Sequence, residues 1–218
     1  MADISNLILV LGHPGSGKTC SLMNLDPDET IIIRAWKKPL PFKNNFKPFT
    51  VENKKGTLID TADPDKIVKI IKNAKNLGKK VVVIDDFNLI MSQEFMEKAY
   101  VKGFDKFTEI GRHMWDIIKA AQESENDIRF YFLAHIQKDE SGVEKMKTIG
   151  KMLDEKGSID GLFYIILKAV SDNDQHFFAT RTDGSDVVRT PIGMFEDNLI
   201  PNDLKLVDDK IKEYNNIA

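Results

Sequence analysis

Short hydrophobic runs alternate along the chain with polar, glycine-containing or amphipathic stretches. Four runs are nearly unbroken and end at glycine or polar residues, as strands buried on both faces do: residues 6–11, 30–34, 81–84 and 129–135. Two later runs, 162–167 and 176–180, flank the sequence Ser171-Asp172-Asn173-Asp174. Turn residues between two such runs predict a hairpin.

Helical periodicity appears between these runs. From residue 64 to 77, Ile67, Ile70, Ile71, Ala74 and Leu77 share one face, and lysines occupy the other. Further helices are predicted at 20–23, 93–100, 106–122 and around 149–155, whereas the Pro- and Lys-rich stretch 37–48 predicts a surface loop. Together these elements predict an α/β fold, with a mainly parallel sheet flanked by helices and an antiparallel edge hairpin.

Length and composition fit one soluble domain. The 218 residues, 42% hydrophobic and 30% charged, suit a domain over 1–207 followed by a C-terminal tail, 208–218. Cys20 is the single cysteine, so an internal disulfide is impossible and a reducing cytoplasm is expected. The hydrophobic runs all fall short of the ~18 residues of a membrane span.

The net charge of −3 is unevenly distributed. Residues 36–80 contain twelve lysines and four acidic residues, so this segment carries 12 − 4 = +8 and the remainder −3 − 8 = −11. Such a segment fits a polyanionic partner, and it equally fits a solvated lysine surface that keeps the protein soluble.

The first strand leads into a phosphate-binding motif. Gly12-His13-Pro14-Gly15-Ser16-Gly17-Lys18-Thr19 matches G-x-x-x-x-G-K-[ST], and Cys20 begins the predicted helix. The glycines let backbone N–H groups turn toward a phosphate chain, and a following helix would add its positive N-terminus. We therefore expect residues 12–20 to bind ATP, with Lys18 at the β- and γ-phosphates and Thr19 on Mg²⁺.

Two adjacent aspartates end the run at 81–84. Asp85 stands where a carboxylate reaches the Mg²⁺ shell of a P-loop site, so it is the second predicted metal ligand. Asp86 is a candidate base for an attacking water. The alternative is that both residues simply begin a turn after the strand.

Other P-loop classes fit less well. Asp60-Thr61-Ala62-Asp63 lacks the glycine of a GTPase switch, and the sequence contains no Asn-Lys-x-Asp element for reading guanine. A small-molecule kinase stays open, although the later arginines, Arg112, Arg129, Arg181 and Arg189, are not clustered as in a lid.

Four features together resemble phage-encoded RecA-like P-loop ATPases, and most closely the single-strand-annealing recombinases described as AAA-domain ATP-binding proteins. They are the P-loop, the strand ending at Asp85, the strand 129–135 with its polar end, and the sequence Arg189-Thr190-Pro191-Ile192-Gly193-Met194-Phe195. The resemblance spans residues 5–207. It implies a RecA-type core, assembly into a homo-oligomer (ring or filament), and single-stranded DNA bound along the assembly.

The resemblance also implies roles for individual residues. His135 and Gln137 lie where related ATPases place a γ-phosphate sensor, and Gln137 is the preferred candidate; a histidine at a strand end is as often structural. Residues 138–151 correspond to a mobile DNA-binding loop or to an ordinary exposed loop. Arg181, with Arg189 as second choice, corresponds to the basic finger that reaches a neighbouring site, unless it is a surface arginine.

One departure concerns catalysis. These ATPases usually carry a glutamate at the end of the strand that follows the P-loop helix, whereas residues 31–34 read Ile-Ile-Ile-Arg. Either Asp86 takes that role or hydrolysis is slow. The expected function is a Mg²⁺-dependent ATPase acting on single-stranded DNA in phage recombination or replication, in the host cytoplasm. The alternative is an ATP-gated binding or assembly module with little turnover.

Overall fold

The hydrophobic runs form the centre of one sheet. The computed structural model describes residues 6–50, 52, 55–124, 127–149 and 159–217, and within them the sheet has nine strands. They are β1 (Leu7–Gly12), β2 (Thr30–Arg34), β3 (Leu58–Asp60), β4 (Val81–Asp85), β5 (Arg129–Lys138), β6 (Glu144–Met146), β7 (Ile165–Asp172), β8 (Gln175–Ala179) and β9 (Leu199–Pro201). The order is β3-β2-β4-β5-β1-β7-β8-β9, with β6 paired to β5.

Strand direction follows the predicted division. The six strands from β3 to β7 run parallel, whereas β8 and β9 add antiparallel pairs at one edge. All residues of β1, β2 and β4 are buried, because helices or loops cover both faces of a mainly parallel sheet. The predicted fold class, an α/β fold with a mainly parallel sheet flanked by helices and an antiparallel edge hairpin, is confirmed.

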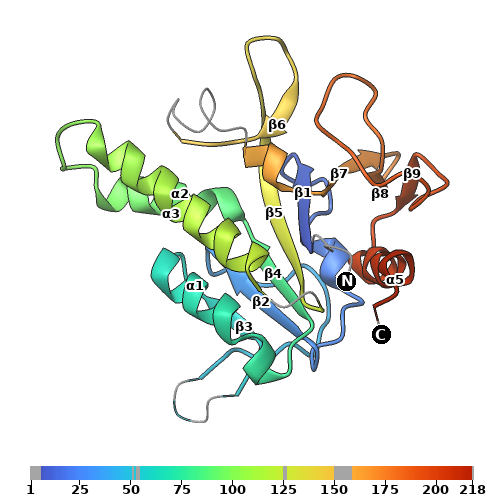
Figure 1. Ribbon diagram of the computed structural model, residues 1–218, viewed down its shortest axis with the longest axis horizontal. Coiled ribbons are helices and arrows are strands. Elements are labelled where there is room, and N and C mark those ends of the chain that lie inside the picture. Colours follow the sequence, from blue (N-terminus) through green and yellow to red (C-terminus); the bar gives the residue numbers. More distant parts are fainter. Residues whose placement is uncertain (1–5, 51, 53–54, 125–126, 150–158, 218) are drawn as a thin grey trace.

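Helices cover the two faces unequally. The described helices are α1 (Pro64–Asn73), α2 (Phe87–Glu97), α3 (Asp105–Gln122) and α5 (Leu204–Asn215), with short 3₁₀ turns η1 (Cys20–Leu22), η2 (Lys75–Leu77) and η3 (Ile159–Leu162). Figure 1 shows α1, α2 and α3 together on one side and α5 on the other. Alternate residues of β1 belong to the two sides: Leu9 packs with the first group of helices and Val10 with α5.

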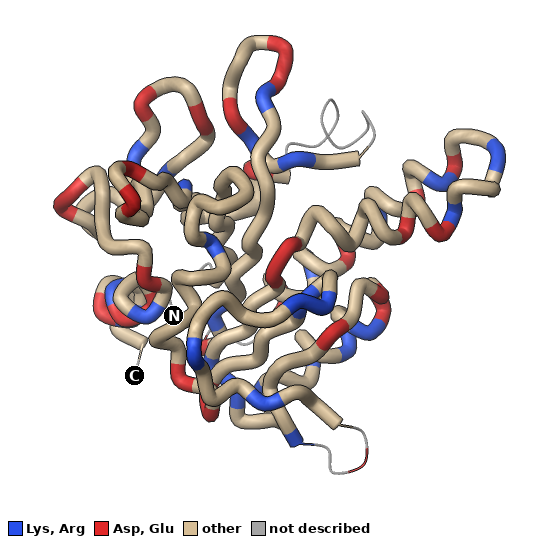
Figure 2. The backbone as a smooth tube through the Cα atoms, turned by 180° about the vertical axis from the view of Figure 1, so that it is seen from behind, with Lys and Arg blue, Asp and Glu red and all other residues tan. Residues whose placement is uncertain are grey.

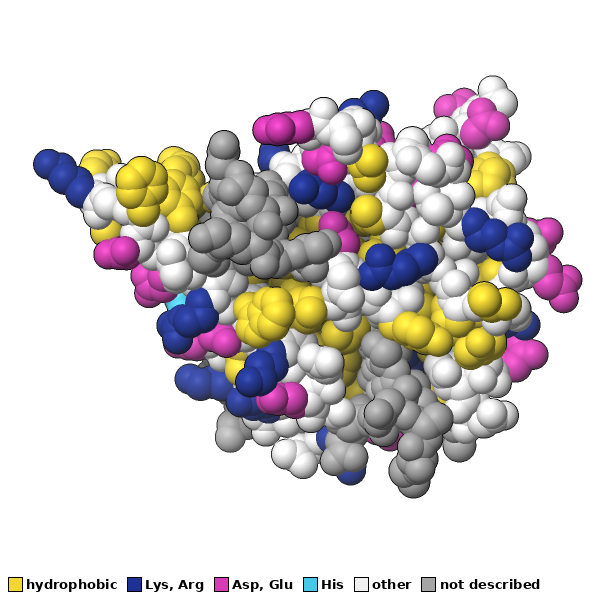
Figure 3. All heavy atoms as spheres, turned by 45° about the horizontal axis from the view of Figure 1, so that its top comes forward, with side chains coloured by type: hydrophobic (Ala, Val, Ile, Leu, Met, Phe, Trp, Pro, Cys, Tyr) yellow, Lys and Arg dark blue, Asp and Glu magenta, His cyan; other side chains and the backbone are white. Residues whose placement is uncertain are grey.

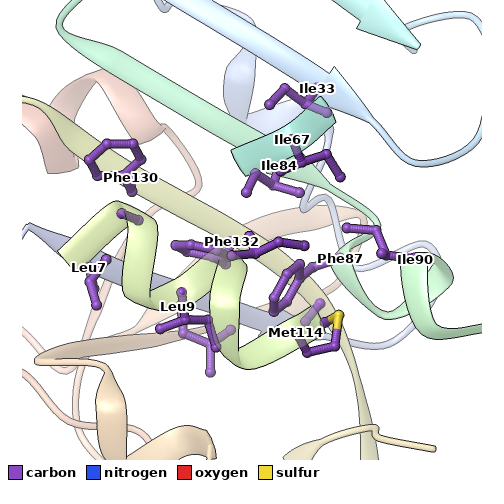
Figure 4. Close-up of a cluster of buried hydrophobic side chains, with 14 of the residues drawn as sticks. Leu7, Leu9, Ile33, Ile67, Ile84, Phe87, Ile90, Met114, Phe130 and Phe132 are labelled. Carbon is purple, nitrogen blue, oxygen red and sulfur yellow. The ribbon is translucent and has the colours of Figure 1, made fainter. Parts of the chain in front are cut away.

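Aromatic packing joins the larger helical layer to the sheet. Phe132 of β5 meets the ring of Phe87 edge-on, with centroids 4.9 Å apart, and that of Phe163 at 5.2 Å. Figure 4 shows Phe87 and Met114 beside Phe132 over the sheet. Since Phe87 comes directly after the two aspartates of β4, this packing fixes where α2 begins.

The helix predicted after the glycine loop is reduced to η1, a single 3₁₀ turn. Pro27 disfavours helix at Asp26, whose side chain instead accepts a bond from the Asp28 N–H at 2.8 Å. A three-residue turn supplies little of the helix dipole expected at this point. An anion at this point would have to be held by the loop's own N–H groups and by Lys18.

Other predicted elements differ in extent. The helix expected at 93–100 begins at Phe87, and Leu77, expected on the buried face, is 56% exposed because α1 has given way to a 3₁₀ turn. Part of the loop expected at 138–151 forms strand β6 on an extended β5, and most of the helix expected at 149–155 lies outside the described residues. Strands β3 and β9 and helix α5 were not predicted.

A buried ion pair attaches α5 to the sheet. Asp208 accepts two hydrogen bonds from the Arg129 guanidinium, at 2.8 and 2.7 Å, and a third from the Tyr131 hydroxyl at 2.7 Å. Ile211, one turn further, is fully buried. Helix α5 therefore runs through residue 207, where the sequence placed the domain end, and packs as part of the same body.

The α2–α3 hairpin extends away from the sheet and ends in exposed hydrophobic side chains. Figure 3 shows these side chains gathered at its end, which carries Met96, Tyr100, Val101 and Phe104. Tyr100 and Phe104 are 97% and 85% exposed. Clusters of this kind are typical of surfaces that contact another molecule. None of the described helices combines the length and apolar character needed to cross a membrane.

Asp208→Asn is expected to lower the free energy of unfolding by about 3–5 kcal/mol, because it leaves the buried Arg129 charge without a counterion. Urea unfolding followed by circular dichroism measures the change. The matched control is Asp209→Asn on the same helix, which affects only partly exposed pairs with Lys205 and Lys212 and should cost no more than about 1 kcal/mol. Equal losses in the two variants would contradict the role given to Asp208.

Candidate functional site

The carboxyl ends of three parallel strands meet at one edge of the sheet. Gly12 ends β1, Asp85 ends β4, and between them β5 carries His135, which lies opposite Gly12 in the strand register. A cleft of about 450 Å³ opens here, lined by Pro14, Gly15, Gly17, Lys18, Thr19, Cys20, Lys38, Pro39, Pro41, Asp86 and His135. In open parallel sheets this edge is where ligands bind.

The glycine loop is held from behind by the C-terminal part of the chain. Gly17 has φ +93°, and its carbonyl accepts a 3.0 Å bond from the Asn202 amide. A Cβ at Gly17 would lie 2.2 Å from that amide nitrogen and 2.9 Å from the His176 ring. Glycine is therefore required here both by the backbone conformation and by the lack of space.

Lys18 folds back over its own loop. Its ammonium donates to the carbonyls of Gly12 and His13, at 2.8 and 3.0 Å, and lies 3.4 Å from Nδ1 of His135. Burial lowers the pKa of Lys18 to about 8, although the charges of Asp86 and Asp85 act in the opposite direction. An anion in the cleft would stabilise this poorly solvated charge.

Thr19 and Asp85 form an oxygen pair beside the lysine. The Thr19 hydroxyl is 3.1 and 3.2 Å from the two carboxylate oxygens of Asp85, whose residue is 1% exposed. Burial, together with the neighbouring Asp86 charge, raises the pKa of Asp85 to about 6. A divalent cation would offset the repulsion between these two buried, adjacent carboxylates. Hydroxyl and carboxylate oxygens are also the ligands that Mg²⁺ prefers.

Asp86 carries the opposite perturbation. Burial alone would raise the pKa of Asp86, but hydrogen bonds from His135 and Lys38, with their charges, bring it down to about 2. Nε2 of His135 is 3.3 Å from one carboxylate oxygen, and the Lys38 ammonium bonds the other. A carboxylate with so low a pKa is a weak proton acceptor.

Asn88 fixes the end of β5 relative to α2. Its side-chain oxygen accepts from the His135 N–H, and its amide donates to the Lys147 carbonyl. The Lys147 N–H in turn donates to the His135 carbonyl at 2.8 Å. Because Asn88 is two residues after Asp86, these bonds fix the position of His135 relative to Asp86.

A second group of charges lies outside the cleft, beside the loop. Glu144 of β6 is 2.7 Å from the Lys168 ammonium, and Nε2 of His13 is 3.5 Å from the other carboxylate oxygen. Lys168 also pairs with Asp186 at 3.0 Å. The nearby Lys168 lowers the pKa of Glu144. The β5–β6 hairpin is thus connected to the glycine loop through Glu144.

The residues present fit a phosphate chain with Mg²⁺. The loop offers N–H groups in positive-φ backbone at Gly15 and Gly17, Lys18 offers a desolvated cation, and Thr19 with Asp85 offers oxygen ligands. These groups come from separate strands and loops and converge on one cleft. The arrangement can bind and polarise a phosphate ester or anhydride.

The other predicted site residues are more dispersed. Of the glycine loop, Pro14, Gly15, Gly17, Lys18, Thr19 and Cys20 line the cleft, whereas His13 and Ser16 do not. Gln137 lies two residues beyond His135 on the part of β5 that pairs with β6. Arg181 is away from the cleft and donates to the Asn198 side chain and to the Phe195 and Glu196 carbonyls at 3.0–3.3 Å. Arg189 bonds the carbonyls of Asp160 and Phe163.

Sequence reasoning missed Lys38, Asn88 and Asn202 as site residues. Lys38 is one of twelve lysines in its segment, and nothing in its neighbours distinguishes it from the others. Asn202 is 185 residues from the glycine that it bonds. Only Asn88 had a local signal, because it closely follows the predicted metal-binding strand.

A scan against protein-family models found no match, and a search of the curated proteins also found none. Among solved structures, the chain is similar to a KaiC-like protein from the hyperthermophilic archaeon Pyrococcus horikoshii OT3, with a TM-score of 0.45 and 11% identity. The match covers 80% of this chain and 76% of that one. The functional proposal below therefore rests on this chain's own residues.

Gly17→Ala is expected to destabilise the protein more than Gly15→Ala. Both glycines have positive φ, which costs a residue with a Cβ roughly 1–2 kcal/mol. A Cβ at Gly15 meets nothing within 4 Å, whereas one at Gly17 collides with Asn202 and His176 and adds an overpacking cost of about 1–3 kcal/mol. The urea midpoints of the two variants measure the difference. Similar midpoints would show that Asn202 and His176 move aside at little energetic cost.

Proposed function

We propose that this protein is an ATP-binding, Mg²⁺-dependent P-loop ATPase. The observation that carries the proposal is the convergence of Lys18, Thr19 and Asp85 at the carboxyl edge of the sheet, with the Thr19 hydroxyl 3.1 Å from Asp85. These are a lysine for phosphate oxygens and two oxygen ligands for a metal, in the combination that phosphoryl transfer requires. The sequence offers no guanine-reading element, which favours ATP over GTP.

In this proposal each residue performs one task. Lys18 releases the carbonyls of Gly12 and His13 and binds the β- and γ-phosphate oxygens. Thr19 and Asp85 hold Mg²⁺, which when bound neutralises charge on those oxygens. The loop residues Gly12 to Cys20 surround the phosphates, and the protein's own N–H groups replace water around them.

The remaining roles are also part of the proposal. Asp86 orients the attacking water, and it acts as the base only if Lys38, which lowers its pKa, leaves the carboxylate. Gln137 or His135 senses the terminal phosphate. His135 is supported by its position, because it contacts both Lys18 and Asp86. Arg181 reaches the site of a neighbouring subunit, which requires a homo-oligomer; the exposed hairpin end at Tyr100 and Phe104 offers such an assembly a contact surface.

A second candidate is an ATP-gated binding module with little turnover. Two observations favour it: Asp86 is neutralised by Lys38, and β2 ends in Arg34, which pairs with Asp60 at 2.7 Å and leaves no carboxylate there for catalysis. The small-molecule kinase stays a further alternative, without a specific contact in its favour.

We also propose single-stranded DNA as the partner, in recombination or replication; the phage setting rests on the resemblance alone. Support comes from the exposed lysines of α1 and η2, Lys69, Lys72 and Lys75, and from lysines on the β5–β6 hairpin. Figure 2 shows basic and acidic residues interspersed along the backbone. The two lysine groups therefore have to be tested separately.

Alkylation of Cys20 provides a test of nucleotide binding that does not depend on turnover, since this single cysteine is exposed and lines the cleft. We expect ATP with Mg²⁺ to slow maleimide labelling of the wild type. Lys18→Ala should lose this protection, because the phosphates lose their cation. Asp85→Asn should keep most of it but release phosphate at least about tenfold more slowly.

Labelling of each variant in 6 M urea controls for the intrinsic reactivity of the thiol. Protection of the wild type without phosphate release would favour the ATP-gated module over the ATPase. If ATP does not protect Cys20 at any concentration, or if it fully protects Lys18→Ala, the assignment of the nucleotide site is wrong.

Binding of a single-stranded oligonucleotide, measured across a salt series with ATP and Mg²⁺, tests the DNA partner. Each phosphate contact contributes roughly −0.7 to the log–log slope for single strands. Changing Lys69, Lys72 and Lys75 together to Ala should flatten the slope by up to about 2, and changing Lys145 and Lys147 by up to about 1.4.

The control replaces three lysines outside both groups, Lys102, Lys119 and Lys210, and so makes the same change in net charge as the triple variant. If the control keeps the wild-type slope and either test variant has a flatter slope, the lysines changed in that variant contact the DNA as proposed. If the wild type does not bind DNA even at low salt, the DNA-directed function is wrong and the ATP-gated module becomes the better account.

A further inference from the structure

Lys38 reaches the cleft from a segment of the chain that is separate from the glycine loop. It belongs to the Pro-rich segment after β2, and its ammonium bonds the carboxylate of Asp86. Its side chain is 47% exposed, whereas that of Asp86 is 5% exposed. Lys38, Pro39 and Pro41 line the cleft together with Lys18 of the glycine loop.

The two members of this ion pair differ in freedom. Asp86 is fixed, because its backbone is in the left-handed region (φ 58°) at the start of α2 and its other oxygen is beside His135. Lys38 is fixed only at its backbone, where its carbonyl accepts a bond from the guanidinium of Arg34. Its four-carbon side chain can move while its origin stays in place.

The backbone anchor is itself rigid. Arg34 is buried at the end of β2, and its guanidinium bonds Asp60 of β3 through Nε and Nη2, both at 2.7 Å. The point from which the Lys38 side chain starts is therefore set by the sheet. The Lys38 ammonium can therefore move from one nearby anion to another while the backbone of its loop stays in place.

We propose that Lys38 is a second phosphate-binding cation, held by Asp86 until a nucleoside triphosphate enters, and that it makes the site select triphosphates over diphosphates. This inference rests on the proposed nucleotide-binding function. In this proposal the glycine loop and Lys18 bind the phosphate chain. Lys38 lies on the carboxylate of Asp86, the neighbour of Asp85, which together with Thr19 is the expected pair of metal ligands.

Competition between anions supplies the selectivity. Moving Lys38 from Asp86 to a ligand breaks one charge-assisted hydrogen bond and forms another. A terminal phosphate carries more negative charge than a carboxylate and can compensate for the lost pair, whereas a diphosphate held deeper in the glycine loop leaves Lys38 on Asp86. Triphosphate affinity should therefore depend on Lys38, and diphosphate affinity should not.

The experiment compares Lys38→Met with Lys37→Met, which removes the same charge from the adjacent exposed lysine. Protection of Cys20 from alkylation, with Mg²⁺, gives the affinity for ADP and for the non-hydrolysable β,γ-imido analogue of ATP. In Lys38→Met we expect a loss of about tenfold or more in affinity for the analogue, the size of one hydrogen bond to a charged group. Affinity for ADP should stay within about twofold.

Lys37→Met should bind both nucleotides as the wild type does, and Lys38→Arg, which keeps the charge, should retain the preference for the analogue. Urea unfolding of Lys38→Met confirms that the variant is folded. If both nucleotides lose affinity equally in Lys38→Met, or if neither does, the inference is overturned while nucleotide binding stands. If neither nucleotide protects the wild type, the proposed function is wrong and the inference falls with it.

Discussion

Asp85 and Asp86 place two adjacent, buried carboxylates at the end of β4, and the rest of the site has to compensate their charges. Charges removed from water need partners, and each aspartate obtains its own. Asp85 has the Thr19 hydroxyl, while Asp86 has Lys38 and His135. The glycine loop, the Pro-rich loop and β5 are therefore drawn to one point, and the pKa values of the two neighbours move in opposite directions, to about 6 and about 2.

The strand order makes this convergence possible. Strand β5 lies between β1 and β4, so the end of β5 places His135 in contact with both Lys18 and Asp86. Asn88 then ties this strand end to the first turn of α2. The aspartates, the end of β5 and the start of α2 are thereby connected by direct contacts.

The glycine loop is also supported from outside the cleft. Asn202 bonds Gly17, Glu144 lies beside His13, and α5 is fixed to β5 by the buried pair of Arg129 and Asp208. These contacts hold the loop in position although the helix after it is only one 3₁₀ turn. Preorganisation that a longer helix would provide here comes instead from distant parts of the chain.

Local patterns in the sequence were enough for the central strands, the amphipathic α1, the edge hairpin and the phosphate motif, since each depends on residues within a few positions of one another. The sequence placed Thr19 and Asp85 on one metal ion, and the shared carboxyl edge of the parallel strands brings the two side chains within 3.1 Å of each other. Tertiary structure alone decided which of twelve lysines faces Asp86, that His135 lies inside the cleft, and that Asp208 and Asn202 hold the core and the glycine loop. These roles depend on contacts between residues 47 to 185 positions apart, where the choice among chemically equivalent side chains is made by packing and by the pairing of buried charge.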